Sequence, residues 1–263
     1  MKVIAICSQK GGVAKTTLSL NLGVTAERRG IATVLIDVDP QQSLSKLGDE
    51  RPKGSVPDVI SAQASRLARN LDEVRAAGAE LVIIDTGPNS EIASKLAMQA
   101  ANYVIIPCKP SPIDLKAIEA TLDLAASAGE RPKAVVLTMA PPGKSTIVPE
   151  TAEVIRASGY EVSPVVIHQR QPYVYATAAG QAVIEFDARS KSAEEIDALW
   201  VWVASKIGLD AGKTDRPEAR KATTREAHEP NSREDARAES QKARSATTGK
   251  VGKATNPRAR KAP

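Results

Sequence analysis

Residues 9–17 read QKGGVAKTT and follow the apolar run at residues 3–7 after a single serine, Ser8. Paired glycines permit a tight turn, and the helical pattern that begins at the lysine places Leu18, Leu22 and Ala26 on one face. Such a turn aims backbone N–H groups and a helix N-terminus at one point, where a phosphate group is favoured. The segment therefore predicts a phosphate-binding loop between a first strand and a first helix.

Short β-branched runs alternate with longer helical patterns through the rest of residues 1–210. This alternation predicts one α/β domain with a doubly wound, mostly parallel sheet and helices on both faces. We expect strands at residues 2–8, 33–37, 81–85, 103–107, 134–139 and 162–167. We expect helices from Lys15 to a stop at Gly30 and over residues 63–77, 91–101, 114–128, 149–158 and 193–207.

Acidic side chains end two of the expected strands. Asp37 and Asp39 lie in the run VLIDVDPQQ, and Asp85 ends the run LVIID. Because open α/β sheets bind ligands at the carboxyl ends of their strands, we expect these carboxylates beside the phosphate-binding loop. Taken alone, Asp37 and Asp39 could cap a helix or stabilise a turn, and Asp85 could be structural. Their conjunction with the loop favours a nucleotide site with a metal ion.

Two motifs carry a family resemblance. KGGVAKTT resembles the KGGxGKT[ST] loop, the deviant Walker A motif of the ParA/MinD superfamily of P-loop NTPases, and only Ala14 departs from it. DVDPQ resembles the DxDPQ motif that follows the second strand in that family. The proline-rich segment 107–114 and the late segment 170–183, of the form R-x-x-Y-x-x-A-x-x-x-G-x-x-V, resemble small ParA partition ATPases that lack an N-terminal DNA-reading domain. The resemblance covers nearly all of residues 1–207.

The resemblance implies an ATPase with ATP and Mg²⁺ as cofactors. It places Lys10, Lys15 and Asp39 in catalysis, with Lys15 at the β- and γ-phosphates, Asp39 at the attacking water and Lys10 reaching the partner's phosphates in a homodimer. The implied metal residues are Thr16, Asp37 and Asp85. The implied nucleotide-binding residues are Lys10, Gly11, Gly12, Val13, Ala14, Lys15, Thr16 and Thr17, with Pro107 and Pro110 flanking the adenine.

An alanine at position 14 raises a separate expectation, because glycine usually occupies that place in the motif. A β-carbon there restricts either the backbone φ or the approach of the phosphate. We therefore expect weakened or slower nucleotide handling, and not its loss.

The implied function is an ATP-dependent dimerising switch that binds non-specific DNA and positions or segregates cargo, with plasmid or chromosome partition as the expected process. Slow hydrolysis, stimulated by a cognate adaptor protein, would reset the switch, and the expected location is cytoplasmic and nucleoid-associated. Arg170 and the lysines and arginines of the C-terminal tail are candidate DNA contacts. Arg170, Tyr173 and Tyr175 could equally form a surface loop with two half-buried aromatic rings.

The net charge of +5 is unevenly distributed along the chain. From Ala211 onward there are 14 Lys and Arg against 7 Asp and Glu, a net charge of +7, so residues 1–210 carry a net charge of −2. This basic tail, residues 211–263, is too poor in apolar residues to bury a core, and we expect it to be disordered. It could bind DNA phosphates, or serve as a solubilising or partner-binding linker.

Several other classes fit the sequence less well. The two cysteines, Cys7 and Cys108, lie far apart, which fits a reducing cytoplasm and gives no disulfide framework, zinc spacing or iron–sulfur pair. After Leu209 the only large aliphatic residue is Val251, which disfavours a MinD-like membrane anchor, and no membrane partner is expected. Lys10 with its paired glycines and the DVDPQ motif disfavours a metabolic ligase, and no tyrosine follows Tyr175 as in a tyrosine autokinase. Two alternatives stay open: a MinD-like or other positioning ATPase that does not act on DNA, and a nucleotide-binding dimerisation module with little turnover.

Overall fold

The computed structural model describes residues 1–212. Residues 213–263, which hold the tail lysines and arginines considered as DNA contacts, lie outside the described part of the chain. Arg29 donates hydrogen bonds to the carbonyl oxygens of Ala211 and Gly212, and the Trp200 indole donates to that of Ala211. The packed part of the chain therefore reaches Gly212. Within it, no helix combines the length and the apolar character needed to cross a membrane.

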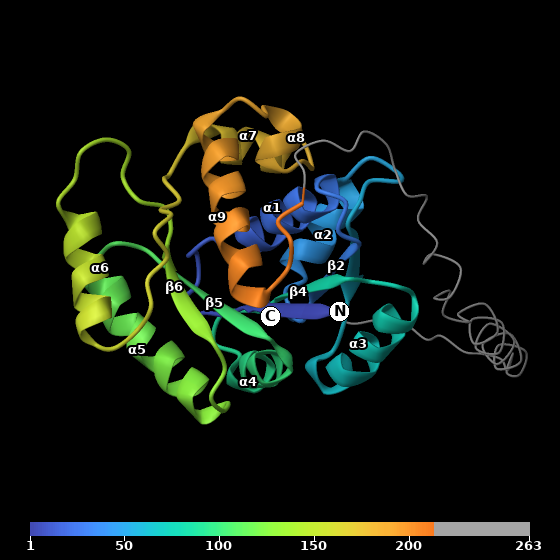
Figure 1. The fold of residues 1–263 in the computed structure, drawn as a ribbon, viewed down its shortest axis with the longest axis horizontal. Coiled ribbons are helices and arrows are strands. Elements are labelled where there is room, and N and C mark those ends of the chain that lie inside the picture. The colour runs from blue at the N-terminus through green and yellow to red at the C-terminus, as the bar shows by residue number, and fades with distance from the viewer. Residues whose placement is uncertain (213–263) are drawn as a thin grey trace, which may run out of the picture. The chain divides into compact units, whose positions relative to one another are not determined.

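A six-stranded sheet lies at the centre of the fold (Figure 1), and every strand pair in it is parallel. The strand order is β3-β2-β4-β1-β5-β6, so β1 lies between β4 and β5. The expected parallel α/β architecture is confirmed. The strands are β1 (Lys2–Ile6), β2 (Thr33–Asp37), β3 (Asp58–Ser61), β4 (Leu81–Asp85), β5 (Tyr103–Cys108) and β6 (Lys133–Leu137).

Helices connect the strands and cover both faces of the sheet. All the predicted helices are present, with small shifts of their ends. The structure also contains α2, α7 and α8, which the sequence analysis did not predict. The helices are α1 (Lys15–Arg28), α2 (Ser43–Glu50), the 3-10 turn η1 (Ala64–Arg66), α3 (Leu67–Ala76), α4 (Glu91–Ala100), α5 (Pro112–Ser127), α6 (Ile147–Ala157), α7 (Gln171–Ala178), α8 (Val183–Phe186) and α9 (Lys191–Ile207).

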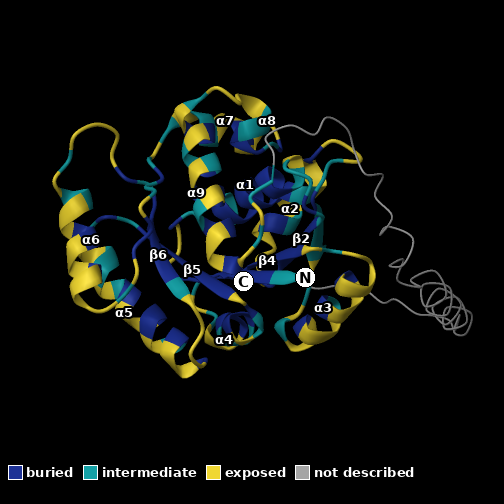
Figure 2. Cartoon of the chain, in the orientation of Figure 1, coloured by how far each residue is buried: buried dark blue, intermediate teal, exposed yellow. Residues whose placement is uncertain are grey.

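The side chains of β1 point alternately into two hydrophobic cores, one on each face of the sheet. Ile4 and Ile6 belong to a core shared with α1 and α9, whereas Val3, Ala5 and Cys7 belong to a core shared with α3, α4, α5 and α6. Successive side chains of a strand point to opposite faces, so one strand feeds both cores. Figure 2 shows the result as a buried sheet between helices whose outer faces are exposed.

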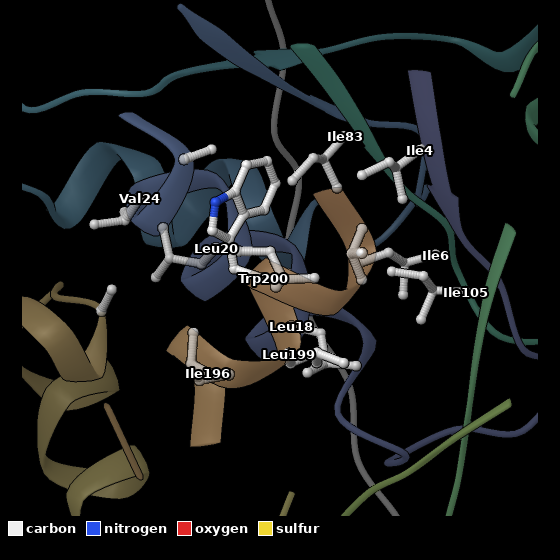
Figure 3. Close-up of a cluster of buried hydrophobic side chains, with 14 of the residues drawn as sticks. Ile4, Ile6, Leu18, Leu20, Val24, Ile83, Ile105, Ile196, Leu199 and Trp200 are labelled. Carbon is white, nitrogen blue, oxygen red and sulfur yellow. The ribbon is translucent and has the colours of Figure 1, made fainter. Parts of the chain in front are cut away.

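Trp200 anchors the core on the α1 and α9 side. Its side chain is fully buried, and Figure 3 shows it among Leu20, Val24 and Ile83. A buried aromatic ring of this size removes a large apolar area from water, and its N–H needs a partner, which the Ala211 carbonyl provides. This packing holds α1, the helix that follows the phosphate-binding loop, against the sheet.

The prediction of a strand at residues 162–167 is wrong. Val162 and His168 form only isolated bridges, with Val135 and Ala140 respectively. Pro164 lies in the middle of the segment and has no N–H, so it cannot continue a hydrogen-bonded ladder. The edge strand β3, by contrast, was not predicted, because its four residues carry polar groups at both ends.

Candidate functional site

The phosphate-binding loop runs from the end of β1 to the start of α1, as the sequence predicts. Gly12 has a φ of 70°, and Ala14, at the N-cap of α1, has a φ of 67° and a ψ of 29°. Ala14 therefore adopts the left-handed conformation that glycine enters freely and that costs an L-residue about 1–2 kcal/mol. The expected effect of this alanine on nucleotide handling stays a prediction.

Lys15 is drawn into the loop rather than out to solvent. Its ammonium group is buried and donates hydrogen bonds of 3.0 Å to the Ser8 carbonyl oxygen and 2.9 Å to the Lys10 carbonyl oxygen. Burial lowers the pKa of Lys15, while the nearby carboxylates of Asp85 and Asp39 oppose that shift. The Lys10 side chain, by contrast, is exposed.

The Asp85 side chain is fully buried at the end of β4. Its Oδ2 accepts a hydrogen bond of 2.7 Å from the Thr16 hydroxyl, and its Oδ1 accepts one of 3.0 Å from the Ser19 hydroxyl. Burial raises the pKa of Asp85 to about 7, although both hydrogen bonds act in the opposite direction. A buried carboxylate with so high a pKa is a group whose charge a cation would stabilise.

Ser19 is a site residue that sequence reasoning missed. It lies one helical turn after Lys15 and is fully buried between Leu18 and Leu20 of α1. Its hydroxyl oxygen also lies 3.1 Å from the Lys15 carbonyl oxygen, an alternative acceptor for the same proton. A polar residue at the i+4 position from the loop lysine is the signal that could have identified it.

Asp37 and Asp85 occupy paired positions on the neighbouring strands β2 and β4. The Asp37 carboxylate accepts hydrogen bonds from the Asp39 backbone N–H at 2.9 Å and from the Ser45 N–H and hydroxyl at 2.8 and 3.0 Å. It therefore fixes the DVDPQ turn to the first turn of α2. In this arrangement Asp37 stabilises a turn and also lies level with Asp85 on the neighbouring strand.

The Asp39 side chain lies against Gly87, and Gly87 belongs to the turn that follows β4. A β-carbon on Gly87 would fall 2.5 Å from Asp39 Oδ1, so only glycine leaves room for that carboxylate. The other contact of Asp39 Oδ1 is a hydrogen bond of 2.9 Å from the Gln41 backbone N–H. The ends of β2 and β4 thus bring Asp37, Asp39 and Asp85 together beside Lys15, as the sequence predicts.

The β5 and β6 side of the loop is held by Thr138. Its hydroxyl lies 3.1 Å from the Val13 carbonyl oxygen and 3.3 Å from the Cys108 carbonyl oxygen, and its N–H donates to Cys108 over 2.8 Å. Pro107 and Pro110 are both buried next to this junction. Sequence reasoning did not single out Thr138.

Arg170 lies apart from this group of residues. Its guanidinium donates two hydrogen bonds, of 3.0 and 2.6 Å, to one carboxylate oxygen of Glu195 on α9, which also pairs with His168. Tyr173 is half-buried and donates to the Ser192 carbonyl oxygen, whereas Tyr175 is 57% exposed beside Phe186. The geometry gives Arg170 an intramolecular role, and a DNA contact there stays a prediction.

Comparison with known proteins matches this chain to a family of nucleotide-binding domains. The model of the CobQ/CobB/MinD/ParA nucleotide binding domain matches residues 4–183. The maintenance of carboxysome distribution protein A of Gloeobacter kilaueensis is 29% identical over 212 residues, which cover 80% of this chain and 95% of that protein.

Solved structures show the same fold. The MinD cell division protein of Aquifex aeolicus superposes with a TM-score of 0.64 and 20% identity over 80% of this chain and all of that one. A putative plasmid partition protein of Borrelia burgdorferi bound to AMPPNP gives a TM-score of 0.59 and 17% identity over 78% of this chain and 98% of that one. The resemblance to the ParA/MinD superfamily is confirmed. The chain therefore belongs to the CobQ/CobB/MinD/ParA family of nucleotide-binding domains.

Proposed function

We propose that the protein is an ATP-dependent switch that dimerises around bound Mg-ATP and separates after hydrolysis. The observation that carries this proposal is the hydrogen bond between Thr16 and Asp85, which joins the start of α1 to the end of β4 beside the buried Lys15 ammonium group. A hydroxyl, a carboxylate and an ammonium group in one place are the protein groups that a magnesium nucleotide requires.

The residues present fit a magnesium ion that is held largely by nucleotide and water. Within residues 1–212 no group of three or more Cys, His, Asp or Glu residues is placed to hold a metal ion by itself. Mg²⁺ in nucleotide sites uses one or two protein oxygens together with phosphate and water. Thr16 would offer its hydroxyl, and Asp85 and Asp37 would orient the water shell. The bound ion would neutralise charge that develops on the phosphates.

The loop and its neighbours would then divide the work of binding and positioning. Lys15 would donate to the β- and γ-phosphates, and the backbone N–H groups of residues 11–17 would surround the phosphate chain. Asp39 would position the attacking water, since its carboxylate lies beside Gly87 in the turn after β4 and near the Lys15 ammonium group. Pro107 and Pro110 would flank the adenine. Catalysis of this kind consists mainly of positioning and charge stabilisation, which suits a slow, partner-stimulated timer.

Dimerisation rests on Lys10. Because the side chain of Lys10 is exposed while that of Lys15 is buried, Lys10 is free to reach the phosphates of a second copy. ATP would thereby close two copies face to face, and loss of the γ-phosphate would open them.

The cargo-positioning role follows from the family and from the composition of the tail. Relatives are named for carboxysome distribution, cell division and plasmid partition. We propose that the ATP dimer binds non-specific DNA and so associates with the nucleoid, and that an adaptor protein stimulates its ATPase. The net charge of +7 from Ala211 onward would add salt-sensitive contacts with phosphate. A chain truncated after Gly212 should bind DNA more weakly, and unchanged affinity across a salt series would remove the tail from this account.

A second candidate is a nucleotide-binding dimerisation module with little turnover. The left-handed conformation of Ala14 favours it, because a strained loop can bind phosphate without reaching the geometry of the transition state.

One experiment separates the two candidates. Oligomeric state and phosphate release are measured for wild type, Lys10→Ala and Asp39→Ala with Mg-ATP. The switch predicts slow turnover in wild type, a persistent ATP dimer in Asp39→Ala and a nucleotide-bound monomer in Lys10→Ala. A dimer that releases no phosphate, with or without DNA, supports the module. Rapid hydrolysis by a monomer contradicts both.

A further inference from the structure

The two sides of the phosphate-binding loop differ in charge. Because β1 lies between β4 and β5 in the sheet, the loop that follows β1 has one neighbouring strand end on each side. Asp85 ends β4, and Asp37 and Asp39 lie beyond it, so that side is acidic. The first residue after β5 is Lys109, so a cationic side chain follows the neighbouring strand on the opposite side.

Strand register places Lys109 level with the loop. Ile6, the last residue of β1, pairs with Ile105, and β5 continues for three more residues to Cys108. The end of β5 thus runs alongside the loop, and Thr138 fixes the two together through the Val13 and Cys108 carbonyl oxygens. Gly12 directly precedes Val13 and Lys109 directly follows Cys108, so Gly12 and Lys109 lie near this junction.

The side chain of Lys109 extends over the loop. Its ammonium nitrogen lies 3.9 Å from the position that a β-carbon on Gly12 would occupy. Gly12 is exposed, so the ammonium group stands beside an open part of the loop. Within residues 1–212, Lys109 forms no ion pair with a carboxylate.

From this placement we propose that Lys109 is a further nucleotide-binding residue, whose ammonium group binds the α- or β-phosphate on the side of the loop away from the metal carboxylates. The inference rests on the proposed function, since it assumes that the loop holds a nucleotide. The loop backbone surrounds the α- and β-phosphates, so a cation beside Gly12 faces those groups and not the γ-phosphate. A lysine binds phosphate as a point charge and needs no fixed geometry.

The charge of Lys109 is tested by the affinities for Mg-ATP and Mg-ADP of four variants. Lys109→Gln should weaken both nucleotides about tenfold and to the same extent, because both carry the α- and β-phosphates. Lys109→Arg, which keeps the charge, should stay within about threefold of wild type. Lys116→Gln is the matched control, since Lys116 is exposed on α5 seven residues away, and it should bind like wild type. The fourth variant, Lys15→Ala, tests the nucleotide site itself.

Thermal unfolding separates a binding role from a structural one. Without nucleotide, Lys109→Gln should unfold at the same temperature as wild type, and only the increase in melting temperature on adding Mg-ADP should shrink. If Lys109→Gln binds both nucleotides as tightly as Lys116→Gln while Lys15→Ala loses them, the assignment of Lys109 is wrong and the nucleotide site stands. If wild type binds neither nucleotide, the proposed function fails, and this inference fails with it.

Discussion

The Thr16 hydroxyl donates a hydrogen bond of 2.7 Å to the Asp85 carboxylate and so ties the first turn of α1 to the carboxyl end of β4. Thr16 follows the loop lysine and Asp85 is 69 residues further along the chain, yet both belong to one site. This contact satisfies one oxygen of a fully buried carboxylate, and a bound magnesium ion would offset the charge of that carboxylate. The stability of the nucleotide-free protein should therefore depend on the charge of Asp85.

Asp85→Asn tests that dependence through pH. Because burial raises the pKa of Asp85 from its ordinary value to about 7, the folded protein keeps a proton that the unfolded chain has lost between about pH 4 and 7. The stability of wild type is thus reduced as pH rises through that window, by up to about 1.4 kcal/mol per pH unit from this group. The advantage of Asp85→Asn over wild type in free energy of unfolding should grow from pH 4 to 7 and then level off. Urea unfolding without nucleotide measures it, and a difference that stays constant with pH would exclude a raised pKa.

Ala14→Gly tests the strain in the loop. Glycine adopts the left-handed conformation without the steric cost of a β-carbon, so the free energy of unfolding should rise by about 1 kcal/mol. Ala120→Gly is the matched control, because Ala120 is exposed within α5, where glycine should cost about 1 kcal/mol. Denaturant unfolding of both variants should give opposite signs. A loss of stability in Ala14→Gly would show that the loop is not strained at this residue.

The ion pair between Arg51 and Glu185 joins the end of α2 to α8. Two hydrogen bonds of 2.9 Å link them, and the Arg51 side chain is only 3% exposed. Glu185→Gln should cost about 3 kcal/mol because it leaves a buried guanidinium without its countercharge. Glu73→Gln breaks the exposed pair with Arg69 and should cost less than about 0.5 kcal/mol. Equal costs in chemical unfolding would mean that the Arg51 pair is solvated like a surface pair.

Much of this fold can be predicted from the sequence, because parallel strands buried on both faces are nearly continuous apolar runs. β2 and β4 match the expected limits for that reason. β3 could not be found, since an edge strand of three half-buried residues and one exposed residue lacks such a run. The segment 162–167 was misjudged because its apolar residues pack beside β6 without forming a ladder across Pro164.

The residues of the candidate site could likewise be predicted only in part from the sequence. Lys15, Asp39 and Asp85 could be predicted because each of them lies within a short continuous sequence motif. Ser19 could have been found from its i+4 spacing to Lys15. Thr138 and Lys109 reach the loop through strand register, which becomes visible only when the sheet order is known. Contacts between distant segments of this kind leave no signal in a single sequence.

The most direct test of the central claim is the binding of the full chain to non-specific duplex DNA with Mg-ATP, with Mg-ADP and without nucleotide, at low and moderate salt. A switch of the proposed kind binds DNA with ATP only, and its affinity falls steeply as salt increases. Binding that is the same in all three nucleotide states would contradict control by the nucleotide. Absence of binding in every state would contradict the DNA-positioning role and leave a nucleotide switch that acts on another surface.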